Sequence, residues 1–139
     1  MMNRKTPGAR RSGEKLMRGI GRMFRTTGLH IGYRYEDSPI CVPDGTPPSS
    51  DHPEDYEPSA RPGSRAPHVG EDRSTLDLFG HGFVLLQIGP DAPDVSVFEA
   101  IAAASGLPLT TVAVARQDLH DLYERRLGLV RPDGHVAWR

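Results

Sequence analysis

Apolar residues gather in the second half of the chain, after Leu76, and their spacing predicts the strands of a small sheet. Residues 83–88 form a continuous apolar run between glycines, which is typical of a central strand covered on both faces. Residues 109–114 are rich in β-branched side chains and predict a second strand. Because a helical pattern separates the two runs, we expect these strands to be parallel neighbours.

The segment between the two strands predicts a helix over residues 95–105. Asp94 supplies an N-cap, and Gly106 stops the helix together with the proline that follows it. Glu99 falls on a solvated face of the helix. The side chains expected to form its buried stripe are Val95, Phe98, Ile101 and Ala102.

The end of the chain predicts a short helix over 118–125 followed by a β-hairpin over 127–138. The hairpin turn is Pro132-Asp133-Gly134, which suits a tight reversal. The helical side chains expected to face the core are Leu119, Leu122 and Tyr123. The resulting order is β-α-β-α-β-β, an α/β unit with a thioredoxin-like arrangement of a parallel pair beside a terminal hairpin.

The first half of the chain predicts a tail and a connector. Residues 1–27 are basic and rich in glycine, and contain at most a short amphipathic helix. Residues 28–66 predict a proline-rich linker with one short strand over 29–35, or a segment that wraps a surface in extended form. The domain itself is expected over 67–139, where Ser74 or Thr75 caps a single helical turn that Gly80 ends.

Charge limits the partners of the chain. The net charge of -1 conceals eight Lys or Arg residues against one acid between Met1 and Arg25. A nucleic-acid or membrane-surface arm is one interpretation. We favour a solvated tail, because aromatic residues do not alternate with the basic ones. The prediction is therefore no nucleic-acid partner and no membrane partner, and no apolar run approaches the roughly 20 residues needed to span a bilayer.

The sequence contains no recognisable catalytic or metal-binding pattern. A thioredoxin-like redox site needs two thiols at the start of its first helix, but residues 89–95 contain no cysteine. The single thiol, Cys41, fits a reducing cytoplasm. The six histidines are scattered without metal-ligand spacing, and no serine lies in a G-x-S-x-G turn. We predict no catalytic residue, no cofactor-binding residue and no metal ligand.

Three stretches of sequence resemble one enzyme family. RPGSRAPHV at 61–69, with STLDLFG and GFVLL after it, resembles the start of the C-terminal domain of FAD-dependent aromatic-ring hydroxylases, flavoprotein monooxygenases of the phenol and polyketide hydroxylase type. IGYRYEDSP and VPDGT, within 31–46, are similar to the segment leading into that domain. LVRPDGHVAWR at 129–139 is similar to its closing hairpin. The resemblance implies a thioredoxin-like domain of an enzyme that uses FAD and NAD(P)H.

The resemblance also implies elements that this sequence lacks. In the family, a flavin-binding domain precedes this domain, and a last helix follows it and covers one sheet face. We therefore expect a fragment, missing the final helix, that binds no cofactor and is inactive alone. Its role would be structural, with a flavin-binding domain or subunit as partner.

Arg65 and His68 are the candidate residues for an interface with that flavin domain or for a contact with its cofactor region. For the isolated chain we favour the alternative, that both are surface residues on a proline turn. The alternative function is a free-standing, non-catalytic thioredoxin-like interaction module that complements a separate flavin subunit or mediates dimers. An exposed apolar face after Leu76 would favour this alternative.

Overall fold

The computed structural model describes residues 30–49, 55–70 and 74–139. The predictions for residues 1–27 lie outside the described residues. The elements in chain order are η1 (Thr75–Leu78), β1 (Phe83–Ile88), α3 (Ser96–Ser105), β2 (Leu109–Val114), α4 (Gln117–Tyr123), β3 (Leu127–Val130) and β4 (Val136–Trp138).

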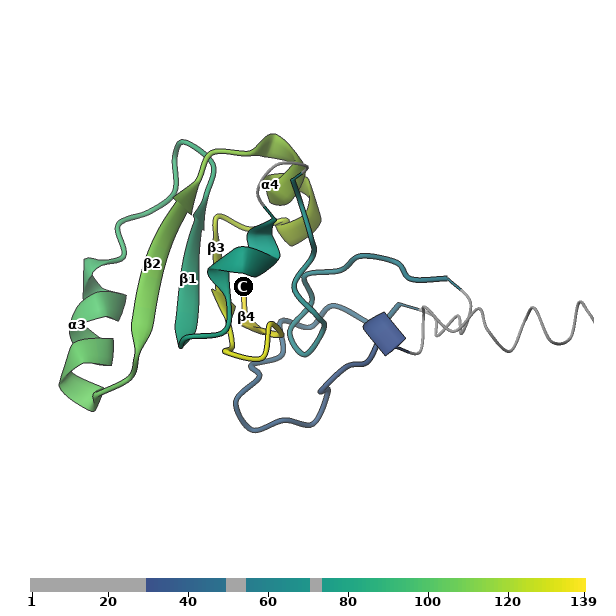
Figure 1. The fold of residues 1–139 in the computed structure, drawn as a ribbon, viewed down its shortest axis with the longest axis horizontal. Coiled ribbons are helices and arrows are strands. Elements are labelled where there is room, and N and C mark those ends of the chain that lie inside the picture. The colour runs from purple at the N-terminus through teal and green to yellow at the C-terminus, as the bar shows by residue number, and fades with distance from the viewer. Residues whose placement is uncertain (1–29, 50–54, 71–73) are drawn as a thin grey trace, which may run out of the picture.

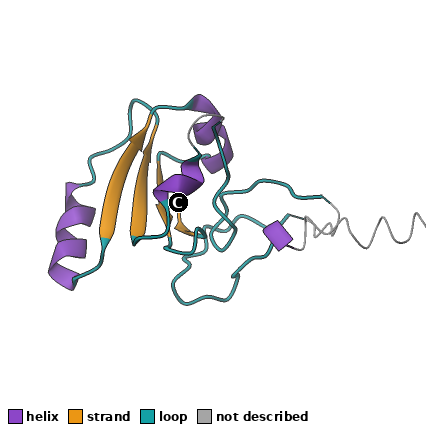
Figure 2. Cartoon of the chain, viewed as in Figure 1, coloured by secondary structure: helices purple, strands orange, loops and turns teal. Residues whose placement is uncertain are grey.

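The four strands form one mixed sheet in the order β2-β1-β3-β4 (Figures 1 and 2). β1 and β2 are parallel, with Phe83 opposite Leu109, and α3 connects them. β3 is antiparallel to β1, and β4 is antiparallel to β3 after a register shift near Val130. The predicted α/β class and the β-α-β-α-β-β order are confirmed.

One face of the sheet holds the main core. Alternate residues of β1 (Val84, Leu86 and Ile88) are buried there beside Leu119 and Tyr123 of α4. Each buried aliphatic side chain of this size contributes about 1.5–3 kcal/mol relative to exposure. The predicted inward face of the second helix is confirmed, since its third apolar side chain also packs against this cluster.

The opposite face of the sheet is covered by α3, which lies on the other side from α4 and η1 (Figure 1). Val95 and Ala102 are buried against it, as predicted. The prediction was wrong for Phe98 and Ile101, which remain 39% and 61% exposed. The Phe98 ring reaches the sheet only at its edge, where it lies 5.9 Å from the Trp138 ring of β4, and most of the Ile101 side chain faces away from the sheet.

The predicted strand over 29–35 is not present in its described part. Residues 30–31 are helical, and Tyr33 is 60% exposed instead of half-buried. The Tyr35 N–H donates to the Gly63 carbonyl at 2.9 Å, so this segment runs beside a loop and not beside a strand. An alternating pattern forms a strand only where a partner edge is available.

The boundaries of the other elements follow their caps. Ser74, one of the two predicted caps, accepts from the Leu76 N–H at the start of η1, although Phe79 and not Gly80 ends the turn. Gly106 ends α3 in the left-handed conformation, with φ 66°. α4 ends two residues earlier than expected, because Glu124 takes a left-handed conformation with φ 55°.

Candidate functional site

The proline-rich segment lies against the terminal hairpin. It therefore wraps a surface of the domain, which was one of the two predictions, and is not a detached linker. We call residues 36–46 the strap. The Val42 N–H donates to the Ala137 carbonyl of β4 at 2.8 Å. Cys41 of the strap is buried against the hairpin, with its Sγ 3.7 Å from the Val136 carbonyl oxygen. The strap thus lies along the last strand of the sheet.

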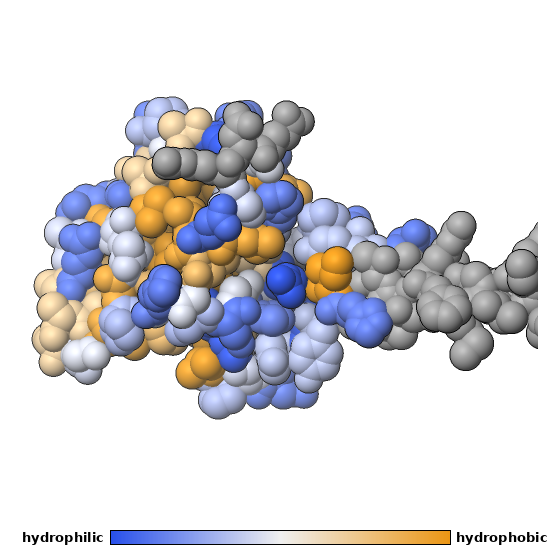
Figure 3. Space-filling view, in the orientation of Figure 1, coloured by the Kyte–Doolittle hydropathy of each residue, from blue (hydrophilic) through white to orange (hydrophobic). Residues whose placement is uncertain are grey.

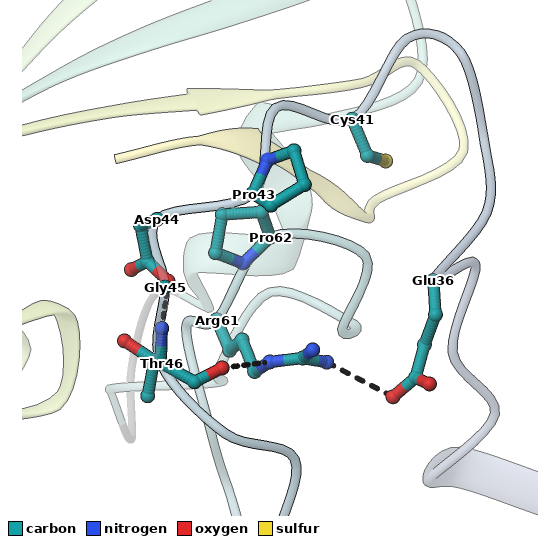
Figure 4. Close-up of a pocket in the computed structure, with 8 residues that line it drawn as sticks. All are labelled: Glu36, Cys41, Pro43, Asp44, Gly45, Thr46, Arg61 and Pro62. Carbon is teal, nitrogen blue, oxygen red and sulfur yellow. Dashed lines mark hydrogen bonds and ion pairs between the residues drawn. The ribbon is translucent and has the colours of Figure 1, made fainter.

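A small cavity separates the strap from the loop at Arg61 (Figure 4). The Arg61 guanidinium donates to the Thr46 carbonyl at 2.7 Å and to Glu36 Oε1 at 2.9 Å. The cavity volume is about 140 Å³. Its lining residues are Glu36, Cys41, Pro43, Asp44, Gly45, Thr46, Arg61 and Pro62.

Arg139 joins the strap to the body of the domain through a buried ion pair. Its Nε lies 2.6 Å from Asp44 Oδ2, and its Nη2 donates to Thr46 Oγ1 at 3.0 Å. Its Nη1 donates to the Tyr123 carbonyl at 3.0 Å, and Glu124 lies 3.5 Å away. Every nitrogen of this buried guanidinium therefore has a partner, as a desolvated charge requires.

The Asp44 carboxyl is held in its ionised form. Burial by itself would raise the pKa of Asp44, but hydrogen bonds from Arg139 and Thr46 outweigh it and lower the pKa from 3.8 to about 2. Because the pKa is lower in the folded state, the ionised carboxylate contributes stability above pH 3.8 that is lost as the pH falls through about 2.

The Asp44→Asn variant tests this linkage. We expect the free energy of unfolding of the wild type to exceed that of the variant at about pH 5, and the difference to shrink toward about pH 2. Urea titrations of both proteins across this range measure the difference. A gap of constant size across the range would show that the Asp44 charge contributes nothing to the fold.

The two residues predicted at a domain interface are both exposed on the proline-rich loop before η1. Arg65 forms an isolated β-bridge with His135, and His68 Nδ1 lies 2.8 Å from Ser74 Oγ. The structure therefore gives each a different partner within the domain. Their contact with a flavin domain stays a prediction.

Sequence reasoning missed a second cluster on the strap side of the hairpin. The Tyr35 ring meets His135 edge-on at 4.7 Å, and the Arg131 guanidinium carbon lies 4.8 Å from the Tyr35 ring centroid. The resemblance covered these positions without assigning them a role. No local pattern could have paired them, because Tyr35 and the hairpin are far apart in sequence.

The described residues offer no fit for a flavin dinucleotide. Dinucleotide folds place a glycine-rich turn between a strand and a helix, so that backbone N–H groups approach the phosphates. The corresponding connection here, between β1 and α3, contains Asp91 and Asp94, whose carboxylates repel phosphates. The cavity beside Arg61 is also smaller than the roughly 300 Å³ at which ligand pockets begin.

Metal chemistry and membrane insertion find no support in the same residues. No three His, Cys, Asp or Glu side chains in the described ranges are grouped to hold a metal ion. Within the part of the chain that the structure describes, no helix has the length and apolar character needed to cross a bilayer.

Residues 59–139 match the family described as "Aromatic-ring hydroxylase, C-terminal". The chain belongs to this family. The chain is 39% identical over 123 residues to aklavinone 12-hydroxylase RdmE of Streptomyces purpurascens, covering 78% of this chain and 23% of that protein. It is 38% identical over 126 residues to the FAD-dependent monooxygenase apdD of Emericella nidulans, covering 82% of this chain and 20% of that protein.

The chain also superposes on solved structures of relatives. Chromopyrrolic acid-soaked RebC with bound 7-carboxy-K252c matches with a TM-score of 0.80 and 42% identity, over 97% of this chain and 26% of that one. The recognised family resemblance is confirmed. The chain spans about a quarter of the length of these relatives.

Proposed function

We propose that this chain acts as the C-terminal domain of an FAD-dependent aromatic-ring hydroxylase, with a structural role and no activity of its own. The observation that carries the proposal is the family match over 59–139 in a chain whose described residues cannot cradle a dinucleotide. Hydroxylation of an aromatic ring would then depend on FAD and NAD(P)H held by a separate flavin-binding domain or subunit.

Arg65 and His68 are the side chains that we propose for the contact with that flavin domain. Both are exposed, and both stand on a loop whose neighbours Ala66, Pro67 and Val69 are buried. A loop anchored in this way holds its outward side chains in fixed positions, which favours a defined interface.

The purified chain should remain colourless after gel filtration with FAD, and it should not oxidise NAD(P)H. The physical reason is that the connection between β1 and α3 contains the carboxylates of Asp91 and Asp94, where a dinucleotide fold places backbone N–H groups against the phosphates. Retained flavin absorbance would contradict the proposal directly.

A chimera tests the interface and has its own readout. This chain would replace the matching segment of aklavinone 12-hydroxylase RdmE. The double variant Arg65→Ala, His68→Ala should then lower the stability of the chimera by about 1–3 kcal/mol, because truncated interface side chains leave partners unpaired. The matched control is the double variant His120→Ala, Arg125→Ala, whose residues lie on α4 and just after it. This control should leave the stability of the chimera unchanged.

A self-associating interaction module is the second candidate, and one observation favours it. Val97, Phe98 and Ile101 of α3 are between 39% and 65% exposed, and Leu107 beyond the helix is 41% exposed. Figure 3 shows apolar surface gathered near the middle of this face of the molecule, with polar and apolar side chains mixed around it. Sedimentation of the chain alone distinguishes the candidates, since a mass of two chains would favour the module.

A further inference from the structure

We propose that the strap, residues 36–46, opens as a separate unit from a domain that stays folded. The ion pair between Arg139 and Asp44 holds the strap closed. Opening would uncover the Cys41 thiol and the Ala137 carbonyl of β4. This inference does not depend on the proposed function, because it concerns contacts within this chain alone.

The strap is held by polar contacts and contributes almost nothing to the hydrophobic core. Ile40 and Val42 point their apolar side chains outward, at 50% and 55% exposure. No strap residue belongs to the core cluster between the sheet and α4. Of its apolar side chains only Cys41 is buried, at 8% exposure. Lifting the strap therefore exposes little apolar surface, whereas unfolding the sheet exposes the whole core.

Three arginines of the body hold the strap, at its start, middle and end. Arg61 bonds Glu36 and the Thr46 carbonyl. Arg131 donates to Ser38 Oγ at 3.2 Å and lies 3.6 Å from Cys41 Sγ. The third contact, between Arg139 and Asp44, is the most buried, with 3% and 9% of the two side chains exposed.

The depth of the Arg139 contact gives the strap two distinct states. A buried guanidinium without its carboxylate is strongly unfavourable, so intermediate positions of Asp44 are disfavoured. Once the strap leaves, Arg139 still donates to the Tyr123 carbonyl, and water can reach its other nitrogens. Elements with few apolar contacts open at a lower free energy than the whole fold requires.

Cys41 provides the measurement, because it is the only cysteine in the sequence. We expect the rate of its reaction with the disulfide reagent DTNB, in the full chain, to be independent of urea well below the unfolding transition. Local opening exposes little surface and so has little urea dependence. A labelling rate that rises with the same slope as global unfolding would overturn the proposal.

Two substitutions make the test sharper. Asp44→Asn should raise the labelling rate about tenfold, because Arg139 then loses its charged partner. Asp118→Asn, which makes the same change in the exposed Arg116 pair at the start of α4, should leave the rate unchanged. Equal labelling rates in Asp44→Asn and wild type would show that the ion pair between Arg139 and Asp44 does not hold the strap closed.

Ile88→Val distinguishes strap opening from unfolding even if Asp44→Asn fails to fold. It removes one methyl group from a fully buried β1 side chain. The change destabilises the closed and open states equally, so Cys41 labelling should stay at the wild-type rate. If labelling required global unfolding, the rate would rise about fivefold, and the proposal would fail.

Discussion

Replacing Tyr123 with alanine is expected to lower the free energy of unfolding by about 3–5 kcal/mol. The side chain is fully buried among the core residues of β1, β3 and β4. Its ring packs directly over Gly128 of β3. Truncation would leave a cavity under the centre of the sheet that no neighbouring side chain can fill. For a domain of this size, that loss is a large fraction of the total stability. Urea unfolding followed by circular dichroism measures it.

Tyr123→Phe is the matched control. The Tyr123 hydroxyl is buried without a hydrogen-bond partner among the described residues. Burial raises the pKa of this phenol above its usual value, with a further contribution from Tyr56, so the group stays neutral. Removing an unpaired buried hydroxyl should change the stability by less than about 1 kcal/mol, or raise it. A loss as large as that of the alanine variant would mean that the hydroxyl, and not the ring, is the stabilising group.

Gly128→Ala is expected to destabilise the domain by about 1–3 kcal/mol through overpacking. A Cβ at this position would lie 2.6 Å from Tyr123 Cε1 and 2.8 Å from its Cδ1, closer than carbon atoms approach in real structures. The ring cannot move away, because it is surrounded by the core. The Gly128 backbone needs no left-handed conformation, so the cost is steric alone.

A double-mutant cycle isolates this clash. In a Tyr123→Leu background, which removes the ring, the cost of Gly128→Ala should fall below about 0.5 kcal/mol. If Gly128→Ala lowered the free energy of unfolding equally in the wild type and in Tyr123→Leu, the steric clash would not be with the Tyr123 ring. The glycine is therefore predicted to be required by one neighbouring side chain, which only the folded structure identifies.

Strands and helix ends were predictable wherever local chemistry decides them. The ranges 83–88, 109–114 and 127–130 agree with the structure because glycine, proline and β-branched side chains delimit them. The hairpin turn at 132–134 formed where the proline, aspartate and glycine suit a reversal, with Gly134 at φ 81°. These signals act between neighbours in the chain and need no knowledge of the rest of the fold.

The wrong predictions share one cause. The helical stripe that includes Phe98 and Ile101 is apolar, but the sequence of the helix does not determine how much of this stripe the sheet covers. The alternation at Ile31 to Tyr35 favours a strand, but the neighbouring segment is a loop at Gly63. In both cases the missing information was the identity of the facing element.

The sequence by itself determined the order and type of the elements from Thr75 onward, the lack of a redox cysteine pair and the aromatic-ring hydroxylase family. Only the tertiary structure decided that the proline-rich segment closes over the hairpin through Asp44 and Arg139. These residues stand 95 positions apart, and each is an ordinary charged residue in its local context. A buried ion pair depends on desolvation and on distance, and both quantities arise only when the chain has folded.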